Sequence, residues 1–503
     1  MATGSMATRL NEVTPAARPP WAWRPVGCTA LGMTAVLLGT DSGYGYFRDE
    51  LYFRLLGQRP SWGYQDLLGP LTPLLARTAT WLFGDSLRAI RTPSALLLAV
   101  TVLLVSLLAR EFGGGRGAQV LAAIGTAVSV FPMMAGHVLL TSTLDLPLSL
   151  LVLLFVVRAL LRADVRWWPA CGGVLGVALY NKKLVLLLAL GIVVGLLVAG
   201  PRSVLRDHFL WWGALLAVVV GAPTFVYEVL HGWPMLGVAS GLAEHTGTAN
   251  RIAFVPQQLV LLGPFLVPIW FAGAVALWRR LRAICVGALV CAVVVLVTGG
   301  RPDYLVPFLL VLFAAGCAPA MGWVAGKRQR KALLAAALAL NGGFAAIAAL
   351  PVLPQRVAAA SVLGSVDQIF ADQTGWPELA AQVGVLYRRL PAQERDSTVV
   401  VTANYGQAGA LERFGPLYRL PAVYSGHNQM YRYGPPPESA TTVITVGLKP
   451  EFTRAVFGDC QEYARIGEDS PDVVNGNVGD AIQLCHLPRA NWAALWPEFL
   501  HLN

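Results

Sequence analysis

Apolar runs separated by short polar segments follow one another along the first 352 residues of the chain. Most of these runs approach the roughly 20 residues that a helix needs to cross the hydrocarbon of a bilayer. The pattern predicts a polytopic α-helical membrane protein with about eleven transmembrane helices. They are expected near residues 26–44, 89–109, 117–137, 144–161, 167–181, 184–200, 209–227, 257–278, 283–299, 304–324 and 332–352.

The pattern changes beyond residue 353, where short β-branched runs replace the long apolar ones. The segments "STVVVTANYGQAGALERFG", "LPAVYSGHN" and "ATTVITVG" are typical of strands, the first of them followed by a helix. We therefore expect a segment 1–25, a membrane domain 26–352 whose first loop covers 45–88, and an α/β domain 353–503. The initial "MATGSMATRL" resembles a cloning remnant before Met6 and carries no fold prediction.

Lys and Arg residues are unevenly divided between the two sets of loops. The short loops of one set, after the first, hold only Lys182, Lys183, Arg251 and Arg301, and the other set holds many more. Because cytoplasmic loops carry the excess of Lys and Arg, the richer set is predicted to be cytoplasmic, together with the N-terminal segment. The loop 45–88, the loop 228–256 and the α/β domain are then extracytoplasmic, in a multi-pass protein of the plasma (inner) membrane.

Composition supports this class of protein. The chain of 503 residues is 55% hydrophobic and only 13% charged, whereas soluble proteins carry about 25% charged residues. The formal net charge of +10 follows mainly from the Lys and Arg residues of the cytoplasmic loops. It therefore needs no nucleic-acid partner as an explanation.

The seven cysteines fall into two groups. Two of them, Cys460 and Cys485, lie in the predicted outer domain, where the oxidising environment permits a disulfide between them. The others fall in apolar runs and are expected to be buried thiols: Cys28, Cys171, Cys285, Cys291 and Cys317.

Motifs for nucleotide or metal binding are absent from the sequence. It contains no P-loop, no GxGxxG after a strand, no HExxH and no close Cys/His cluster. His231 and His245, in the predicted loop 228–256, are candidates for a substrate-binding or metal-binding role, with solvated loop histidines as the alternative. No cofactor is predicted and metal independence is favoured, with a divalent ion held by Asp49, Glu50 and Asp145 as the alternative.

A charged segment, "GYFRDELYF" at residues 45–53, directly follows the first apolar run. Further pieces with a distinctive order are "GPLTPLLARTATWLFGDSLRAIRTPSAL", "TSTLDLPLSLLVLLFVVRALLR", "GVALYNKKLVLLL", "HGWPM", "GGRPDYLVPFLLVLFAAG" and "NYGQAGALERFGPLYRLPAVYSGHNQMYRYGPP". In this order the pieces resemble the GT-C glycosyltransferases, in the superfamily of the protein O-mannosyltransferases and the lipid A aminoarabinose transferase. The tail resembles bacterial members without an assigned substrate.

This resemblance implies an enzyme that transfers a sugar from a polyprenyl-phosphate donor to an acceptor hydroxyl, with inversion at the anomeric carbon. The acceptor is a glycan, a glycolipid or a protein, and the sugar is a hexose or a pentose. A hydroxyl ionises far above neutral pH, so a carboxylate must take its proton as the new bond forms, which contributes roughly 10²–10⁴-fold to the rate. The departing phosphodiester needs cationic stabilisation.

The resemblance also implies roles for individual residues. Asp49 matches the family's catalytic Asp and is expected to be the general base. Glu50 would orient the acceptor or a neighbouring cation, with an ion pair to Arg48 or Arg54 as the alternative. Asp145 matches a family Asp at the outer end of the fourth span, where capping of the helix is the alternative.

Cations near the same face are candidates for binding the donor phosphate. Lys182 matches a family lysine, and Lys183 and Arg48 are secondary candidates, with snorkelling to headgroups as the alternative for the lysines. Tyr304 either contacts the phosphate or belongs to the aromatic belt of the membrane interface. Asp66 stands where the family has a donor-binding element in the first outer loop, although the lysine of that element is missing.

Two other classes of protein remain as alternatives. A transporter or flippase for a lipid-linked sugar would also need a lipid groove and outer cations, but it should carry ionisable groups at mid-membrane and internal repeats. A membrane scaffold that presents the outer domain would leave the charged segment around Asp49 unexplained. The enzyme is therefore the favoured hypothesis.

Overall fold

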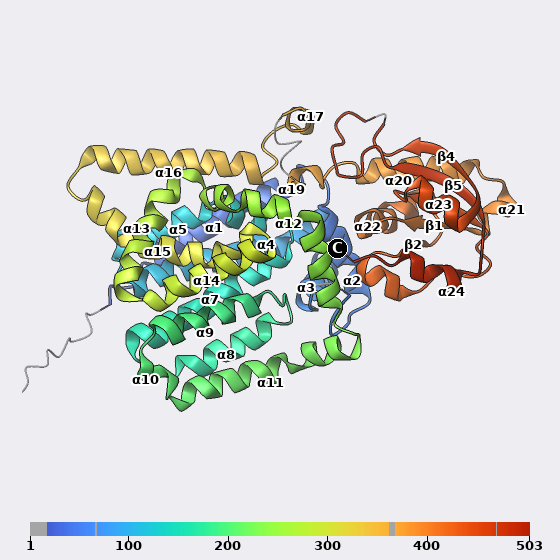
Figure 1. Cartoon of the computed structure of the whole chain (residues 1–503). Coiled ribbons are helices and arrows are strands. Elements are labelled where there is room, and N and C mark those ends of the chain that lie inside the picture. Colours follow the sequence, from blue (N-terminus) through green and yellow to red (C-terminus); the bar gives the residue numbers. More distant parts are fainter. Residues whose placement is uncertain (1–17, 66–67, 362–367, 469, 503) are drawn as a thin grey trace, which may run out of the picture.

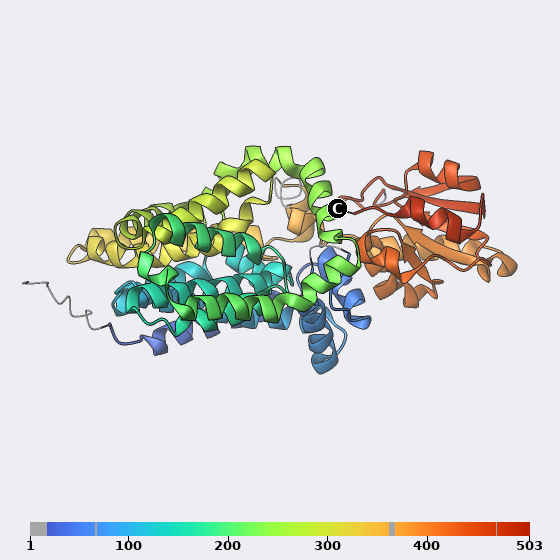
Figure 2. The same ribbon diagram turned by 60° about the horizontal axis from the view of Figure 1, so that its bottom comes forward.

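A computed structural model describes residues 18–65, 68–361, 368–468 and 470–502. A bundle of helices forms one end of the molecule and an α/β unit forms the other (Figure 1). The short helices α2 (Arg48–Gln58) and α3 (Leu71–Phe83) lie at the junction between the two parts. The same division is visible after rotation (Figure 2).

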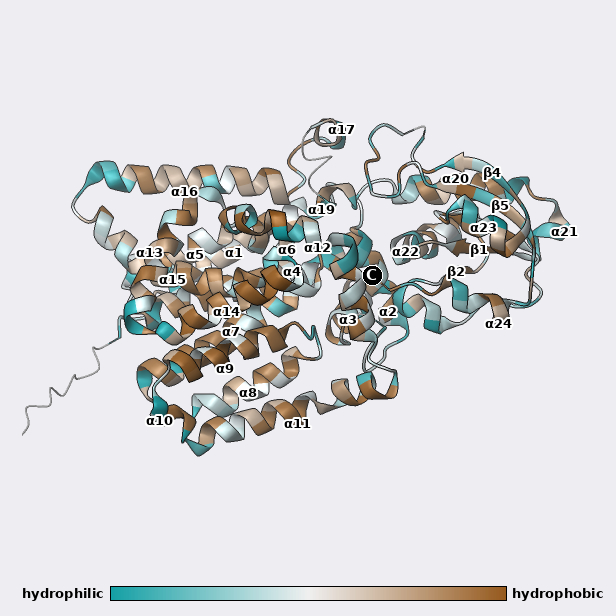
Figure 3. Ribbon diagram, viewed as in Figure 1, coloured by the Kyte–Doolittle hydropathy of each residue, from teal (hydrophilic) through white to brown (hydrophobic). Residues whose placement is uncertain are grey.

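The bundle contains a helix in each of the eleven apolar segments expected from the sequence. Its helices are α1 (Trp23–Thr40), α4 (Leu87–Glu111), α5 (Arg116–Ala127), α6 (Val130–His137), α7 (Thr141–Arg162), α8 (Trp167–Ala178), α9 (Val185–Ala199), α10 (Arg202–Leu205), α11 (His208–Leu230), α12 (Pro234–Val260), η1 (Pro264–Leu266), α13 (Val267–Arg280), α14 (Arg282–Thr298), η2 (Pro302–Leu305), α15 (Val306–Val324) and α16 (Arg328–Ala349). Brown, hydrophobic residues predominate along most of these helices (Figure 3).

Within the described residues, five of these helices are long and apolar enough to cross a membrane, and seven if each bent pair forms a single span. One such pair, α5 and α6, is bent by 59° inside the expected span 117–137. The protein is therefore a mostly helical membrane protein, while the number of eleven transmembrane helices stays a prediction.

The predicted loop 228–256 is wrong, because residues 234–260 form the continuous helix α12. This helix begins at Pro234, whose fixed φ suits the first turn of a helix. A bend of 65° at Gly263 separates α12 from α13. Gly263 has a φ of +99°, which a residue with a side chain rarely adopts. The polar residues of α12 had indicated a loop, although their helical propensity permits either conformation.

The α/β unit is built on a five-stranded sheet with the order β2-β1-β3-β5-β4. Strand β1 (Thr398–Thr402) lies parallel to its neighbours β2 (Val423–Ser425) and β3 (Thr442–Val446). These three strands and α22 (Tyr405–Phe414) confirm the elements expected from the β-branched runs. The sequence prediction missed β4 (Phe457–Arg465) and β5 (Ala481–Pro488), which are antiparallel and contain more polar residues.

Further helices complete this unit. They are α17 (Gln355–Ala359), α19 (Gln368–Ala371), α20 (Trp376–Arg389), α21 (Ala392–Arg395), η3 (Gly415–Tyr418), η4 (Asn428–Tyr433), α23 (Pro450–Val456), α24 (Trp492–Leu495) and η5 (Trp496–Phe499). The apolar face of α20 packs with α22 and the sheet in a core that also includes residues of α2. The α/β unit and the junction helix thus share one hydrophobic core.

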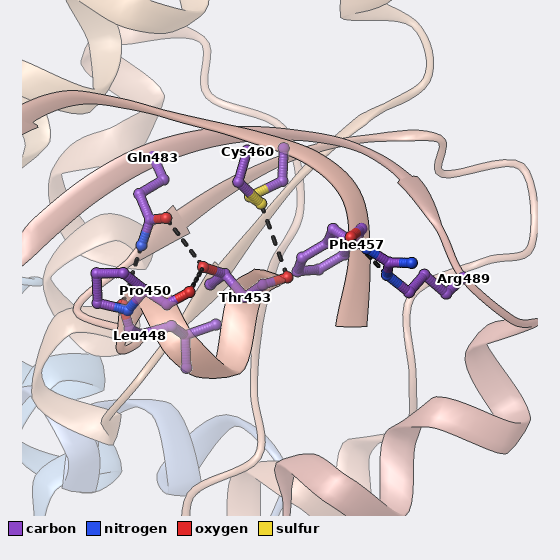
Figure 4. Close-up of a disulfide and its surroundings, with 8 residues drawn as sticks. Leu448, Pro450, Thr453, Phe457, Cys460, Gln483 and Arg489 are labelled. Atoms are coloured by element: carbon purple, nitrogen blue, oxygen red, sulfur yellow. Dashed lines mark hydrogen bonds between the residues drawn. A yellow bond between two sulfur atoms is a disulfide. The ribbon is translucent and has the colours of Figure 1, made fainter. Parts of the chain in front are cut away.

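A disulfide joins Cys460 of β4 to Cys485 of β5, as the sequence analysis expected. The two residues are direct partners in the ladder between these strands. Figure 4 shows the bridge above α23, where Sγ of Cys460 lies 3.8 Å from the carbonyl oxygen of Thr453. The other five cysteines are free thiols. Cys28 is exposed on the bundle surface, so the expectation that all five are buried is wrong for this residue.

Helices α2 and α22 lie in close contact at Gly409. A Cβ atom built on Gly409 would lie 2.8 Å from Cβ of Leu51 and 3.0 Å from its carbonyl carbon. Only glycine fits there, because one of these atoms belongs to the backbone of α2. The close approach fixes the α/β unit against the junction helix.

Gly409→Leu should therefore force α2 and α22 apart. Overpacking of this kind destabilises by about 1–3 kcal/mol, so we expect a lower unfolding temperature and faster trypsin cleavage at the junction. Gly343→Leu is the matched control, since Gly343 is also helical and has open space around it. Equal behaviour of the two variants would contradict a tight α2–α22 contact.

Candidate active site

Asp49 lies in the first turn of α2, at the junction between bundle and α/β unit. Its side chain is 28% exposed, so a substrate can reach the carboxylate. A carboxylate in the first turn is stabilised by the N-terminal end of the helix dipole. The local fold therefore places this side chain at the start of a helix and at a position open to solvent.

The α/β unit contributes a hydrogen bond to this carboxylate. The Tyr405 hydroxyl donates to Oδ1 of Asp49 over 2.9 Å. Tyr405 is the first residue of α22, which begins directly after β1 because Asn404 caps it. The Asn404 side chain accepts from the Gln407 amide over 3.0 Å, and Gln407 Oε1 accepts in return from the Asn404 amide over 3.3 Å. This capping box directs the Tyr405 ring toward α2.

Arg48 lies between two carboxylates. Its Nε is 3.5 Å from Oδ1 of Asp49 and 3.3 Å from Oδ2 of Asp372. Burial raises the pKa of the Asp372 carboxyl, and the Arg48 guanidinium opposes this shift. The guanidinium also lies 5.7 Å from the centre of the Tyr405 ring. Arg48 thus balances the charge of the carboxylates around it.

A second polar group lies on the helices of the bundle. Nζ of Lys182 is 4.8 Å from the centre of the Tyr304 ring. Asp145, on α7, and Tyr304, on η2, line two adjoining small cavities between α7, α9 and α15. Ser142 and Asp303 line the first cavity. The second is lined by Ser149 and by apolar side chains that include Leu187, Leu188, Cys291 and Phe308.

Arg301 connects the two groups electrostatically. Its Nε lies 2.9 Å from Oδ1 of Asp303, and its charge interacts with those of both Asp303 and Asp49. Asp303 and Lys182 in turn interact with Asp145. Carboxylates, cations and an apolar cavity therefore meet at the end of the bundle that faces the α/β unit.

Residues 68–227 match the family model described as dolichyl-phosphate-mannose-protein mannosyltransferase. ArnT from Cupriavidus metallidurans in the apo state superposes with a TM-score of 0.58 at 17% identity, over 92% of this chain and 97% of that chain. The chain therefore has the fold of ArnT, and residues 68–227 are similar to the mannosyltransferase family.

The structure of the same ArnT bound to undecaprenyl phosphate superposes with a TM-score of 0.55 at 17% identity, over 92% of this chain and 97% of that chain. The oligosaccharyltransferase of Archaeoglobus fulgidus in the apo form gives a TM-score of 0.48 at 14% identity, over 84% of this chain and 69% of that chain. None of the curated protein sequences matches the chain at a significant level.

The role expected for Glu50 at the acceptor needs correction. Glu50 is fully buried and forms an ion pair with Arg91, whose Nε lies 2.9 Å from Oε1. The carboxylate also accepts from the backbone amides of Phe47 and Leu139, over 2.8 and 2.9 Å. The expected alternative, a pair with Arg48 or Arg54, is wrong as well. Glu50 is buried and saturated with donors, so it cannot reach an acceptor substrate.

Lys183 is also placed differently from the expectation. It is buried and forms an ion pair with Glu228, at the end of α11. The tight turn after α8 directs the two neighbouring lysines apart, so that Lys182 lies over Tyr304 and Lys183 lies in the protein interior. Buried charges need partners of opposite sign, so Lys183 does not serve as a phosphate ligand. Arg48 is 38% exposed and lies beside two carboxylates, so its role as a phosphate ligand stays a prediction.

The contacts of the two candidate histidines, His231 and His245, are with residues of their own helices and do not involve Asp49. Nδ1 of His231 is 2.8 Å from the carbonyl oxygen of Tyr227, on whose ring it stacks. His245 is exposed on α12, and its Nδ1 contacts the carbonyl oxygen of Gly241 over 2.8 Å. No group of three or more possible metal ligands occurs among the described residues. Asp66 lies outside the described residues.

Asp145 does not cap α7. The N-cap residue of this helix is Leu140, whose backbone amide donates a hydrogen bond to the Thr143 hydroxyl. The sequence analysis missed the contributions of Tyr405, Asp372, Asp303 and Arg301. Arg301 was visible as one of the few cations of the sparsely charged loops. Nothing in the local pattern distinguished Tyr405, whose partner Asp49 is 356 residues away.

Proposed function

We propose that this chain is an inverting glycosyltransferase that moves a sugar from a polyprenyl-phosphate donor to an acceptor hydroxyl on the extracytoplasmic face of the membrane. The observation that carries the proposal is the accessible Asp49 carboxylate, which lies at the same end of the bundle as Lys182, Tyr304 and Arg301. A base for the acceptor and cations for the leaving phosphate are the two groups that this reaction needs.

In this mechanism Asp49 takes the proton of the acceptor hydroxyl while its oxygen attacks the anomeric carbon. The bond between that carbon and the phosphate oxygen breaks in the same displacement, and polyprenyl phosphate departs with the bonding electron pair. A single displacement from the face opposite the leaving group inverts the anomeric configuration. The proton remains on Asp49 until water removes it.

The donor lipid would enter beside the cavities lined by Asp145 and Tyr304. Lys182 and Arg301 would neutralise the phosphate, and the first isoprene units would lie against apolar residues such as Leu187 and Leu188. The solved structure of ArnT with undecaprenyl phosphate supports a donor of this class, since the folds correspond over most of both chains. Asp145 would orient Lys182 through the attraction between their opposite charges.

The acceptor would approach from the side of the α/β unit. This unit adjoins Asp49 through Tyr405, so a glycan, glycolipid or protein held against it can reach the base. The disulfide between Cys460 and Cys485 and the scarcity of Lys and Arg in these loops both favour an extracytoplasmic location for this end.

The proposal is tested with the purified protein in lipid nanodiscs and a panel of ³²P-labelled polyprenyl-phosphate hexoses and pentoses, supplied with a membrane extract as source of acceptors. Release of labelled polyprenyl phosphate is expected with at least one donor. A transporter would instead move intact donor across proteoliposomes without releasing the free phosphate. Transport without release would overturn the proposed enzymatic function.

Lys182→Ala should weaken donor use, because it removes the lysine closest to the proposed phosphate position. A hydrogen bond to a charged group contributes about 1.5–3 kcal/mol, so the KM for the donor should rise at least about tenfold. Lys327→Ala, at an exposed lysine before α16, is the matched control. Unchanged KM and turnover for Lys182→Ala would mean that this side chain only contacts lipid headgroups.

A further inference from the structure

A column of four aromatic rings runs from α2 into the α/β unit. Tyr52 stacks on Tyr405 with ring centres 4.4 Å apart, and Tyr405 stacks on His427 over 4.7 Å. His427 then stacks on His501 over 4.6 Å. The rings come from four separate segments of the chain, so their stacking fixes the α/β unit and the junction helix relative to each other.

The position of Tyr405 is determined from both of its ends. Its backbone amide donates to Nδ1 of His427 over 3.2 Å, and its hydroxyl donates to Oδ1 of Asp49 over 2.9 Å. Tyr405 and His427 follow the carboxyl ends of the adjacent parallel strands β1 and β2. His501 supports the column, because its ring nitrogens lie 2.9 Å from the Phe499 carbonyl oxygen and 2.7 Å from that of Ala403.

The hydroxyl of Tyr405 is a permanent donor in this setting. Burial and the neighbouring Asp49 charge both raise the pKa of this phenol above its ordinary value. In the part of the chain that the structure describes, the carboxylate contacts of Asp49 to Tyr405 and Arg48 both involve Oδ1. Oδ2 takes part in neither of these two contacts.

We propose that Tyr405 is a positioning residue for Asp49, so that the α/β unit completes the active site rather than only binding the acceptor. The inference rests on the proposed function, because it takes Asp49 as the base. Through its hydrogen bond, Tyr405 holds the ionised carboxylate in one rotamer with Oδ2 toward the substrate. The stacked rings hold Tyr405 in a fixed position relative to the sheet, and the hydrogen bond from Tyr405 in turn fixes this rotamer of Asp49.

Other charges also face Asp49, and each stays in place when the Tyr405 hydroxyl is removed. They are Arg48 on the same helix, Arg301 before η2 and Asp372 after α19. Tyr405→Phe keeps the ring, its stacking and these neighbours, and it deletes only the donor. The variant is therefore expected to fold as the parent protein does.

The first readout follows the ionisation of Asp49 without any substrate. Carbodiimide and isotopically labelled glycine ethyl ester modify protonated carboxyl groups, and peptide mass spectrometry measures the extent at Asp49 across a pH series. A donor to the ionised form favours ionisation, so its loss in Tyr405→Phe should move the labelling midpoint upward by about one pH unit. Tyr431→Phe removes a hydroxyl elsewhere in the same unit and should leave the midpoint unchanged.

The second readout is turnover of whichever labelled polyprenyl-phosphate sugar is active with the parent protein. Tyr405→Phe should lower kcat about tenfold at neutral pH with little change in donor KM, and the acidic limb of the rate profile should move with the labelling midpoint. In an Asp49→Asn background, adding Tyr405→Phe should have no further effect on turnover. This lack of additivity is expected only if Tyr405 acts through Asp49.

Several outcomes would overturn the positioning role. They are an unchanged labelling midpoint in Tyr405→Phe, additive losses in the double variant, and failure of Tyr405→Phe to fold, which would make the hydroxyl structural. The proposed function fails separately, when Asp49→Asn turns over the donor at the normal rate. The labelling midpoint tests the hydrogen bond between Tyr405 and Asp49 whether or not the protein proves to be a glycosyltransferase.

Discussion

Asp49→Asn should reduce turnover at least about 10²-fold while donor binding is largely retained. The substitution keeps the shape of the side chain and its acceptance of the Tyr405 hydrogen bond, but it removes the group that takes the acceptor proton. The expected loss follows from the usual magnitude of general-base catalysis. Release of ³²P-labelled polyprenyl phosphate measures turnover, and co-purified labelled donor measures binding.

Asp459→Asn provides the control for this prediction, since Asp459 is exposed on β4 and far from the junction in the sheet. Near-normal turnover by Asp49→Asn would exclude Asp49 as the base and make Asp145 the next candidate. Loss of donor binding together with activity would instead assign Asp49 a structural role.

Glu50→Ala should destabilise the protein more than any other substitution discussed above. It leaves Arg91 in the interior with its charge unbalanced, because both guanidinium contacts to the carboxylate, at 2.9 and 3.0 Å, are lost. Removing one partner of a buried ion pair costs about 3–5 kcal/mol. We expect a large fall in the unfolding temperature in nanodiscs, with activity lost as a consequence.

Asp85→Ala is the matched comparison, because Asp85 pairs with Arg54 of the same helix and is 42% exposed. Exposed ion pairs contribute about 0–1 kcal/mol, so this variant should unfold close to the parent temperature. If Glu50→Ala unfolded at the same temperature as Asp85→Ala but lost turnover, Glu50 would have the catalytic role that its buried position argues against.

The bundle could be predicted from the sequence because a bilayer imposes long apolar helices, and their residues are contiguous. The strands β1, β2 and β3 were predictable for a related reason, since they are buried and β-branched. Strand β4 is an exposed edge strand rich in polar residues, and Gln483 and His486 interrupt the apolar residues of β5, so neither strand gives such a signal. Residues 234–256 contain polar and small residues that suit a helix or a loop equally.

The site could be predicted only where its residues are neighbours in the chain. Asp49 was found because it lies in a charged segment with a recognisable order. The partner of Glu50 is 41 residues away and that of Lys183 is 45 residues away, so local patterns could not identify Arg91 or Glu228. A substrate-binding role was predicted for Glu50 and for Lys183 because the sequence did not reveal their buried partners.

The contact between Asp49 and Tyr405 has a consequence for biosynthesis. The ribosome makes α2 early and adds Tyr405 only 356 residues later, after every helix of the bundle. Asp49, the proposed base, therefore remains without its hydrogen-bond donor while the helices of the bundle are made. It gains its positioning contact only when the α/β unit has been synthesised and has packed against α2.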